Sequence, residues 1–164
     1  MFKKLYIWFG VLFLIGGCGG NEAFDALKAH DDQVGWAHTG DQEFNMFAQG
    51  GMLTSKDKTT GTIVASGMLK QKIDGWLSNA KEKHTKTTNY QFTFADIKPM
   101  HDALEENHKA WLGVTTALKK MVDGADGDTQ LKEARGHTDK LLASKKAFDE
   151  ARNAYIAKHN IKTY

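Results

Sequence analysis

The residues of this chain best suited to chemistry lie in the segment HDALEENH, residues 101–108. His101, Glu105 and His108 stand at positions i, i+4 and i+7, so a helix carries all three side chains on one face. Imidazole nitrogens and carboxylate oxygens are common ligands of transition metals. These three residues are therefore the candidate metal ligands, although long amphipathic helices also carry such triplets as solvated or hydrogen-bonded side chains.

Other predicted helices contribute further polar residues to their inner faces, namely His30, Asp41 and His137. Metal sites in the core of ferritin-like bundles use two Glu-x-x-His units together with a Glu from each of the other two helices. Only residues 105–108 match such a unit here. The pattern therefore does not predict a di-iron centre, and a simpler metal or haem site remains the alternative.

Motifs of enzyme classes are missing from the sequence. It contains no GxSxG, no HExxH, no phosphate-binding glycine loop and no CxxCH for haem attachment. Cys18 is the single cysteine, which excludes an intramolecular disulfide and a thiolate zinc cluster. We therefore predict a protein that is not an enzyme and has no cofactor other than the candidate metal.

The first eighteen residues indicate export and lipid attachment. A basic start, MFKK, precedes an apolar stretch of 11 residues, LYIWFGVLFLI, which is short for spanning a bilayer. The following IGGC resembles the lipobox of bacterial lipoproteins. This resemblance implies that residues 1–17 are cleaved as a signal peptide and that Cys18 carries lipid, with residues 18–20 as a short tether.

The charge balance bears on location and partners. Lys3 and Lys4 are the charged residues of the predicted signal peptide, so its removal leaves 20 basic and 20 acidic side chains. A neutral body without a basic run argues against nucleic acid as a partner. The lipoprotein resemblance implies a membrane-anchored protein of the cell envelope. Gly19 lies where an aspartate favours the inner membrane, so the outer membrane is expected in a Gram-negative organism.

Apolar residues at helical spacing predict four helices in residues 21–164. They span about Asn21–Gln49, Thr62–Lys81, residues 96–122 and residues 129–159. Loops are predicted at residues 50–62 and 82–96, and the alternating segment NYQFTF is expected to be extended rather than a strand. The fold class is all-α, and an antiparallel four-helix bundle is the most economical arrangement.

Some individual residues have expected positions in this bundle. Asp96 is predicted to cap the third helix, with Pro99 in the first turn. Trp36, Trp76 and Trp111 fall on three different predicted helices and are expected to pack in the core, with a slot for a nonpolar ligand as the alternative.

The sequence therefore leads to two hypotheses of function. The first is a non-enzymatic, lipid-anchored envelope protein that binds an envelope partner or supports an assembly. The alternative is a periplasmic bundle that binds a metal or haem through histidines of the first, third and fourth helices.

Overall fold

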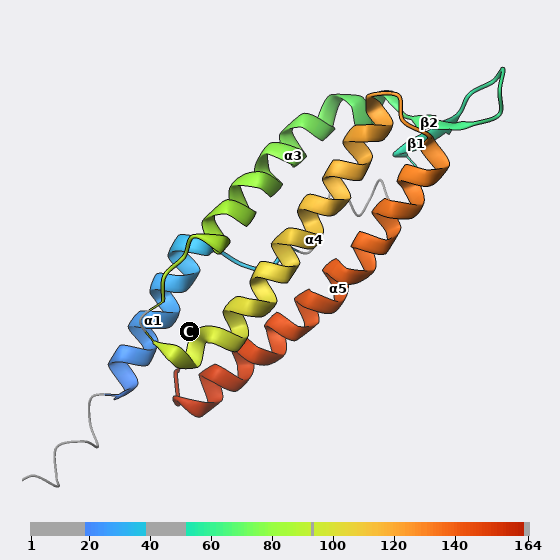
Figure 1. The fold of residues 1–164 in the computed structure, drawn as a ribbon. Coiled ribbons are helices and arrows are strands. Elements are labelled where there is room, and N and C mark those ends of the chain that lie inside the picture. The colour runs from blue at the N-terminus through green and yellow to red at the C-terminus, as the bar shows by residue number, and fades with distance from the viewer. Residues whose placement is uncertain (1–18, 39–51, 93, 163–164) are drawn as a thin grey trace, which may run out of the picture.

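The computed structural model describes residues 19–38, 52–92 and 94–162. In these ranges the protein is mostly helical, which confirms the predicted class. Its elements are four α-helices, a 3-10 turn and a two-stranded sheet: α1 (Gly19–Val34), β1 (Thr54–Lys56), β2 (Ile63–Ala65), α3 (Gly67–Thr88), η1 (Ala95–Ile97), α4 (Lys98–Val122) and α5 (Gly127–Lys158). Helices α3, α4 and α5 lie side by side, with α1 near the end of α3 and the sheet at the opposite end (Figure 1).

Two side chains determine where α3 and α5 begin. The Ser66 hydroxyl accepts a hydrogen bond from the backbone N–H of Leu69, and the Asp126 carboxylate accepts one from that of Thr129. Such caps satisfy backbone donors that have no partner inside the helix. The predicted start at Thr62 was therefore wrong, and α3 continues beyond the predicted end at Lys81.

Helix α4 begins without the predicted aspartate cap. Asp96 lies in η1, and its carboxylate contacts Lys158 Nζ at 2.7 Å and His159 Nε2 at 3.1 Å. Ile97 occupies the cap position instead, and proline is tolerated in the first turn because the missing N–H has no helical partner there. The carboxylate thus joins the start of α4 to the end of α5.

Helix α1 is shorter than predicted. It ends at Val34 because Gly35 adopts a φ of 78° and donates its N–H to the Asp31 carbonyl at 3.0 Å. Residues 35–38 are not helical, and the Trp36 side chain is 57% exposed rather than in the core. The predicted continuation is therefore wrong over residues 35–38, whereas residues 39–49 lie outside the described ranges.

Part of the segment predicted as a loop forms a hairpin. Strands β1 and β2 are antiparallel, with Thr54 opposite Ala65 and Lys56 opposite Ile63. The Asp57 carboxylate accepts hydrogen bonds from the backbone N–H groups of the two threonines at positions 59 and 60. This turn closes the hairpin and corrects the expectation of an irregular loop at residues 50–62.

The buried apolar side chains form two clusters. One joins α3, α4, α5 and the sheet around Trp76 and Trp111, as predicted for these two tryptophans. The other joins α1 to η1, α4 and α5. Its buried members are Ala23, Leu27, Val34, Ile97, Met100, Leu104, Phe148 and Tyr155. Helix α1 thus has its own apolar contact surface, built from few large side chains.

The hairpin is packed closely against the first turn of α5. A Cβ atom added to Gly127 would lie 1.8 Å from the Ile63 carbonyl oxygen, whereas one added to Gly136 meets nothing within 4 Å. We expect Gly127→Ala to lower the free energy of unfolding by about 1–3 kcal/mol through overpacking. Gly136→Ala, the matched control, should raise it by up to about 1 kcal/mol through helix propensity. Urea unfolding tests this pair, and equal stability of the two variants would contradict the predicted packing.

Candidate functional site

The predicted metal ligands lie in two different surroundings on α4. His101 is buried next to His30 of α1, and His108 is buried between Thr87 of α3 and the chain that follows α1. Glu105 is half-buried on the same helix. Across the part of the chain that the structure describes, no group of three or more His, Cys, Asp or Glu is placed to hold a metal ion. Metal binding therefore stays a prediction.

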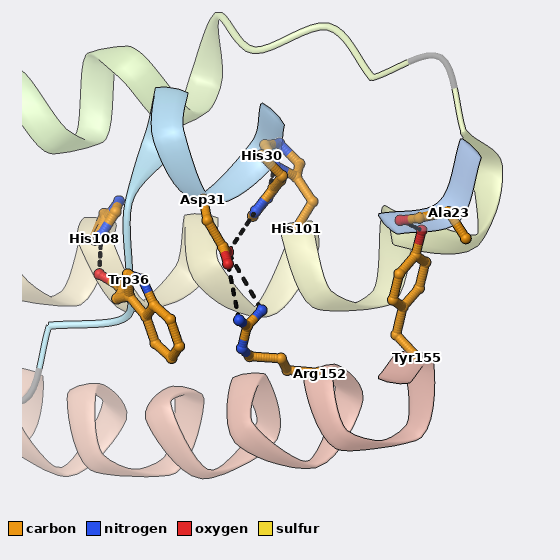
Figure 2. Close-up of polar contacts among 8 residues, drawn as sticks. All are labelled: Ala23, His30, Asp31, Trp36, His101, His108, Arg152 and Tyr155. Atoms are coloured by element: carbon orange, nitrogen blue, oxygen red, sulfur yellow. Dashed lines mark hydrogen bonds and ion pairs between the residues drawn. The ribbon is translucent and has the colours of Figure 1, made fainter. Parts of the chain in front are cut away.

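The first contact is a pair of imidazoles between α1 and α4. His30 Nε2 lies 3.3 Å from His101 Nδ1, and the two rings meet edge to face (Figure 2). The other nitrogen of His30 lies 3.9 Å from the Asp31 carboxylate. This distance is too long for a hydrogen bond, so the direction of the bond between His30 and His101 is set by the tautomers of the two rings. Tyr90 covers this pair, with its ring centroid 5.2 Å from that of His30.

The second contact involves both nitrogens of His108. Its Nδ1 lies 2.6 Å from the Thr87 hydroxyl, and its Nε2 lies 3.2 Å from the Trp36 carbonyl oxygen. A carbonyl can only accept, so the ring donates from Nε2 to Trp36. The Thr87 hydroxyl also donates to the Lys83 carbonyl at 2.8 Å, so its single hydrogen is shared between that carbonyl and His108 Nδ1. His108 acts here as a bridge between α3 and residues 35–38.

The third contact is made by an asparagine that the sequence analysis did not single out. The Asn107 side chain accepts the His38 backbone N–H at 2.5 Å and donates to the His38 carbonyl at 3.2 Å. It also donates to the Leu141 carbonyl of α5 at 3.1 Å. A buried backbone outside regular structure must find such partners. Asn107 thus supplies the hydrogen bonds that a neighbouring strand or helical turn would otherwise give to the His38 backbone.

We refer to His30, His38, His101, His108 and Asn107 as the histidine cluster. Burial lowers the pKa of His38 to about 3 and that of His108 to about 4. Burial, followed by the charge of neighbouring His30, also lowers the pKa of His101. These three histidines are therefore uncharged at neutral pH.

An ion pair lies beside the cluster on its α5 side. Arg152 contacts Asp31 through its two terminal guanidinium nitrogens, at 3.3 and 2.8 Å, and its Cζ lies 4.1 Å from the centroid of the Trp36 ring (Figure 2). The ion pair is mostly buried, whereas the indole remains partly open to solvent. Arg152 therefore fixes both Asp31 and Trp36 in position.

Two more residues predicted to reach the same site lie elsewhere. His137 is half-buried on α5 and packs over Gly113, since a Cβ atom there would lie 2.4 Å from its Nδ1. It faces an open groove between α4 and α5 that also includes Ala103 and Lys140. Asp41 lies outside the described residues. Of the two predicted ligands from other helices that lie in the described ranges, His30 is thus brought to the α4 histidines and His137 is not.

No family model, no curated protein and no solved structure matches this chain. In the ranges that the structure describes, no helix combines the length and apolar character needed to cross a membrane. Function is therefore inferred from the residues and contacts of the chain itself.

Replacing Asn107 tests whether the cluster supports the fold. Asn107→Leu keeps the approximate volume but leaves the His38 N–H and carbonyl buried without their partner. Each unsatisfied buried group costs about 1–3 kcal/mol, so we expect a loss of at least about 2 kcal/mol in urea unfolding. The exposed Asn79 of α3 gives the control, and Asn79→Leu should change stability by less than about 0.5 kcal/mol. Similar small effects of both substitutions would contradict the assigned role of Asn107.

Proposed function

We propose that this protein is a bacterial lipoprotein, anchored through Cys18, whose body is an antiparallel four-helix bundle held at the surface of a cell-envelope membrane. The lipobox-like IGGC motif supports the lipid attachment. Two or three acyl chains give stable anchoring, whereas one gives marginal binding. The expected site is the outer membrane if the organism is Gram-negative.

The position of α1 is the observation that supports this proposal best. Helix α1 begins at Gly19, directly after Cys18, and the Tyr155 hydroxyl donates to the Ala23 carbonyl at 2.8 Å (Figure 2). The rise from Gly19 to Ala23 is about 6 Å in an α-helix. A lipid on Cys18 would therefore hold the body within a short distance of the bilayer surface, without a long tether.

The contacts within the histidine cluster, together with the exposed Trp36 beside it, favour a binding role over catalysis. Both nitrogens of His108 are engaged by protein groups, and the ring nitrogens that face each other in His30 and His101 are paired. In contrast, Trp36 is exposed and held by Arg152, and these two residue types are enriched at the centres of protein interfaces. We infer that this surface contacts an envelope protein partner.

Labelling with an alkyne fatty acid tests the lipid anchor. In a bacterial host, the full chain should incorporate the label, remain with the membranes and yield a mature amino-terminal peptide that begins at modified Cys18. Cys18→Ala should abolish both the label and the cleavage before residue 18, because the chain holds no other cysteine. Label retained by Cys18→Ala, or an unlabelled wild-type chain, would refute the proposal.

A second substitution tests the expected membrane. In a Gram-negative host, the wild-type chain should sediment with the outer membrane, whereas Gly19→Asp should remain with the inner membrane. Gly19→Ser serves as the control, since it changes the same position without adding a carboxylate, and it should sediment like the wild type. Inner-membrane location of the wild type would contradict the outer-membrane prediction while leaving the lipid anchor intact.

A further inference from the structure

The first strand of the hairpin directs part of its backbone away from the second strand. Thr54, Ser55 and Lys56 form β1, and directly after it the Asp57 N–H donates to the Thr62 carbonyl at 2.9 Å. Hydrogen-bonded positions alternate along an antiparallel ladder, so positions 55 and 57 bond to β2. The N–H and C=O groups of Thr54 and Lys56 therefore point outward, away from β2.

The outer edge of β2 is covered, whereas that of β1 is open. Ile63 lies opposite Lys56 and directs its carbonyl outward in the same way, against the first turn of α5 at Gly127. In the ranges that the structure describes, the outward backbone groups of Thr54 and Lys56 have no hydrogen-bond partner. A row of unpaired backbone groups is a template for pairing with another extended chain. We call these outward groups of β1 the open edge.

Exposed apolar side chains gather around the same hairpin. Met52 precedes β1, Val64 lies in β2 and Met68 lies in the first turn of α3, and these residues are between 36% and 48% exposed. The Ser66 hydroxyl donates to the Met52 carbonyl at 2.6 Å, which holds Met52 beside the start of α3. Methionine is common at surfaces that adapt to peptide partners. The hairpin lies at the end of the bundle opposite to α1 (Figure 1).

The charges beside the open edge are basic. Lys56 and Lys58 are exposed, and neither forms an ion pair within the described part of the chain. The Asp57 carboxylate between them accepts hydrogen bonds from the backbone of the turn. The two aspartates that flank Gly127 lie beside the covered edge instead. The open edge thus combines unpaired backbone groups, apolar neighbours and two lysines without a carboxylate partner.

We propose that the open edge binds an extended acidic segment of a partner protein, which joins the sheet as a third strand. Thr54 and Lys56 supply the backbone hydrogen bonds, and the two lysines attract the carboxylates of the segment. Addition of a strand to an open edge is a common mode of peptide recognition. A third strand also stabilises a sheet that has two strands in the described ranges.

The lysines also argue against pairing of two copies of this chain. A second copy would bring its own Lys56 and Lys58 to the same edge, and like charges on adjacent strands destabilise their pairing. Lysine on an edge strand is a common protection against such self-association. A strand of three residues also buries little area by itself, less than a stable dimer needs. The edge therefore favours an acidic partner over a second copy.

Two synthetic peptides test the expected charge of the partner. One alternates glutamate with valine over eight residues, and the other has lysine in place of glutamate. When the first peptide pairs with β1, its glutamates lie opposite Thr54 and Lys56, and a valine lies opposite Ser55, beside Val64. Fluorescence anisotropy with the full chain in mild detergent should show about tenfold tighter binding of the acidic peptide. Equal binding of the two peptides, or no binding, would overturn the proposal.

Three variants separate strand addition from a general attraction between charges. Lys56→Glu should weaken binding of the acidic peptide by about tenfold, whereas Lys70→Glu, the same charge change on α3, should change it by less than about threefold. Thr54→Pro removes an outward N–H but no bond to β2, so it should also weaken binding by about tenfold. Equal effects of Lys56→Glu and Lys70→Glu would contradict the assigned edge. This comparison still decides if circular dichroism shows that Thr54→Pro does not fold.

Amide exchange measured residue by residue locates the added strand. With saturating acidic peptide, the amides of Thr54 and Lys56 should exchange about tenfold more slowly, whereas the Ser55 amide, already bonded to β2, should change little. Unchanged exchange at both outward amides would show that the peptide binds without joining the sheet, and would overturn the proposal. The measurement can be repeated on Cys18→Ala, so its outcome is independent of the lipid anchor.

Discussion

Burying a non-helical backbone against α4 is the constraint on which the other contacts of the cluster depend. Once Gly35 ends α1, the chain crosses α4 without the internal hydrogen bonds of a helix, so its polar groups need partners from side chains. Asn107 and His108 supply them. An apolar residue at either position would fill the same space but would leave buried backbone groups without hydrogen-bond partners. The free energy lost in this way exceeds the free energy gained by burying one additional methylene. The polar residues in this core are therefore required by the path of the chain.

The same constraint places functional features on the surface. Because the His108 and Asn107 contacts hold residues 36 and 38 from one side, the Trp36 side chain points toward α5, where Arg152 stacks on it. Arg152 in turn binds Asp31, the residue next to His30. The ion pair that fixes the exposed indole thus also places a carboxylate 3.9 Å from the buried His30 ring.

The sequence predicted the helical class and much of the inner face of α4, because the spacing of Leu104, Trp111 and Leu118 repeats with the helical period. The same spacing includes position 107, so a polar Asn on an apolar stripe was a signal that was missed. The end of α1 was missed as well, because residues such as Ala37 and Phe44 continue the helical spacing beyond Gly35. The pairing of His30 with His101, 71 residues apart, could not be predicted, because the axial offset between two helices depends on packing across the whole fold.

Helix α4 contributes to both apolar clusters, and the two clusters differ in composition. In the described part, the large buried aliphatic side chains of α1 are Leu27 and Val34, and burying one such side chain contributes about 1.5–3 kcal/mol. The cluster that joins α3, α4 and α5 is larger and includes Trp76 and Trp111. The contact of α1 and residues 35–38 with α4 therefore depends more strongly on buried hydrogen bonds, namely those of His101, Asn107 and His108.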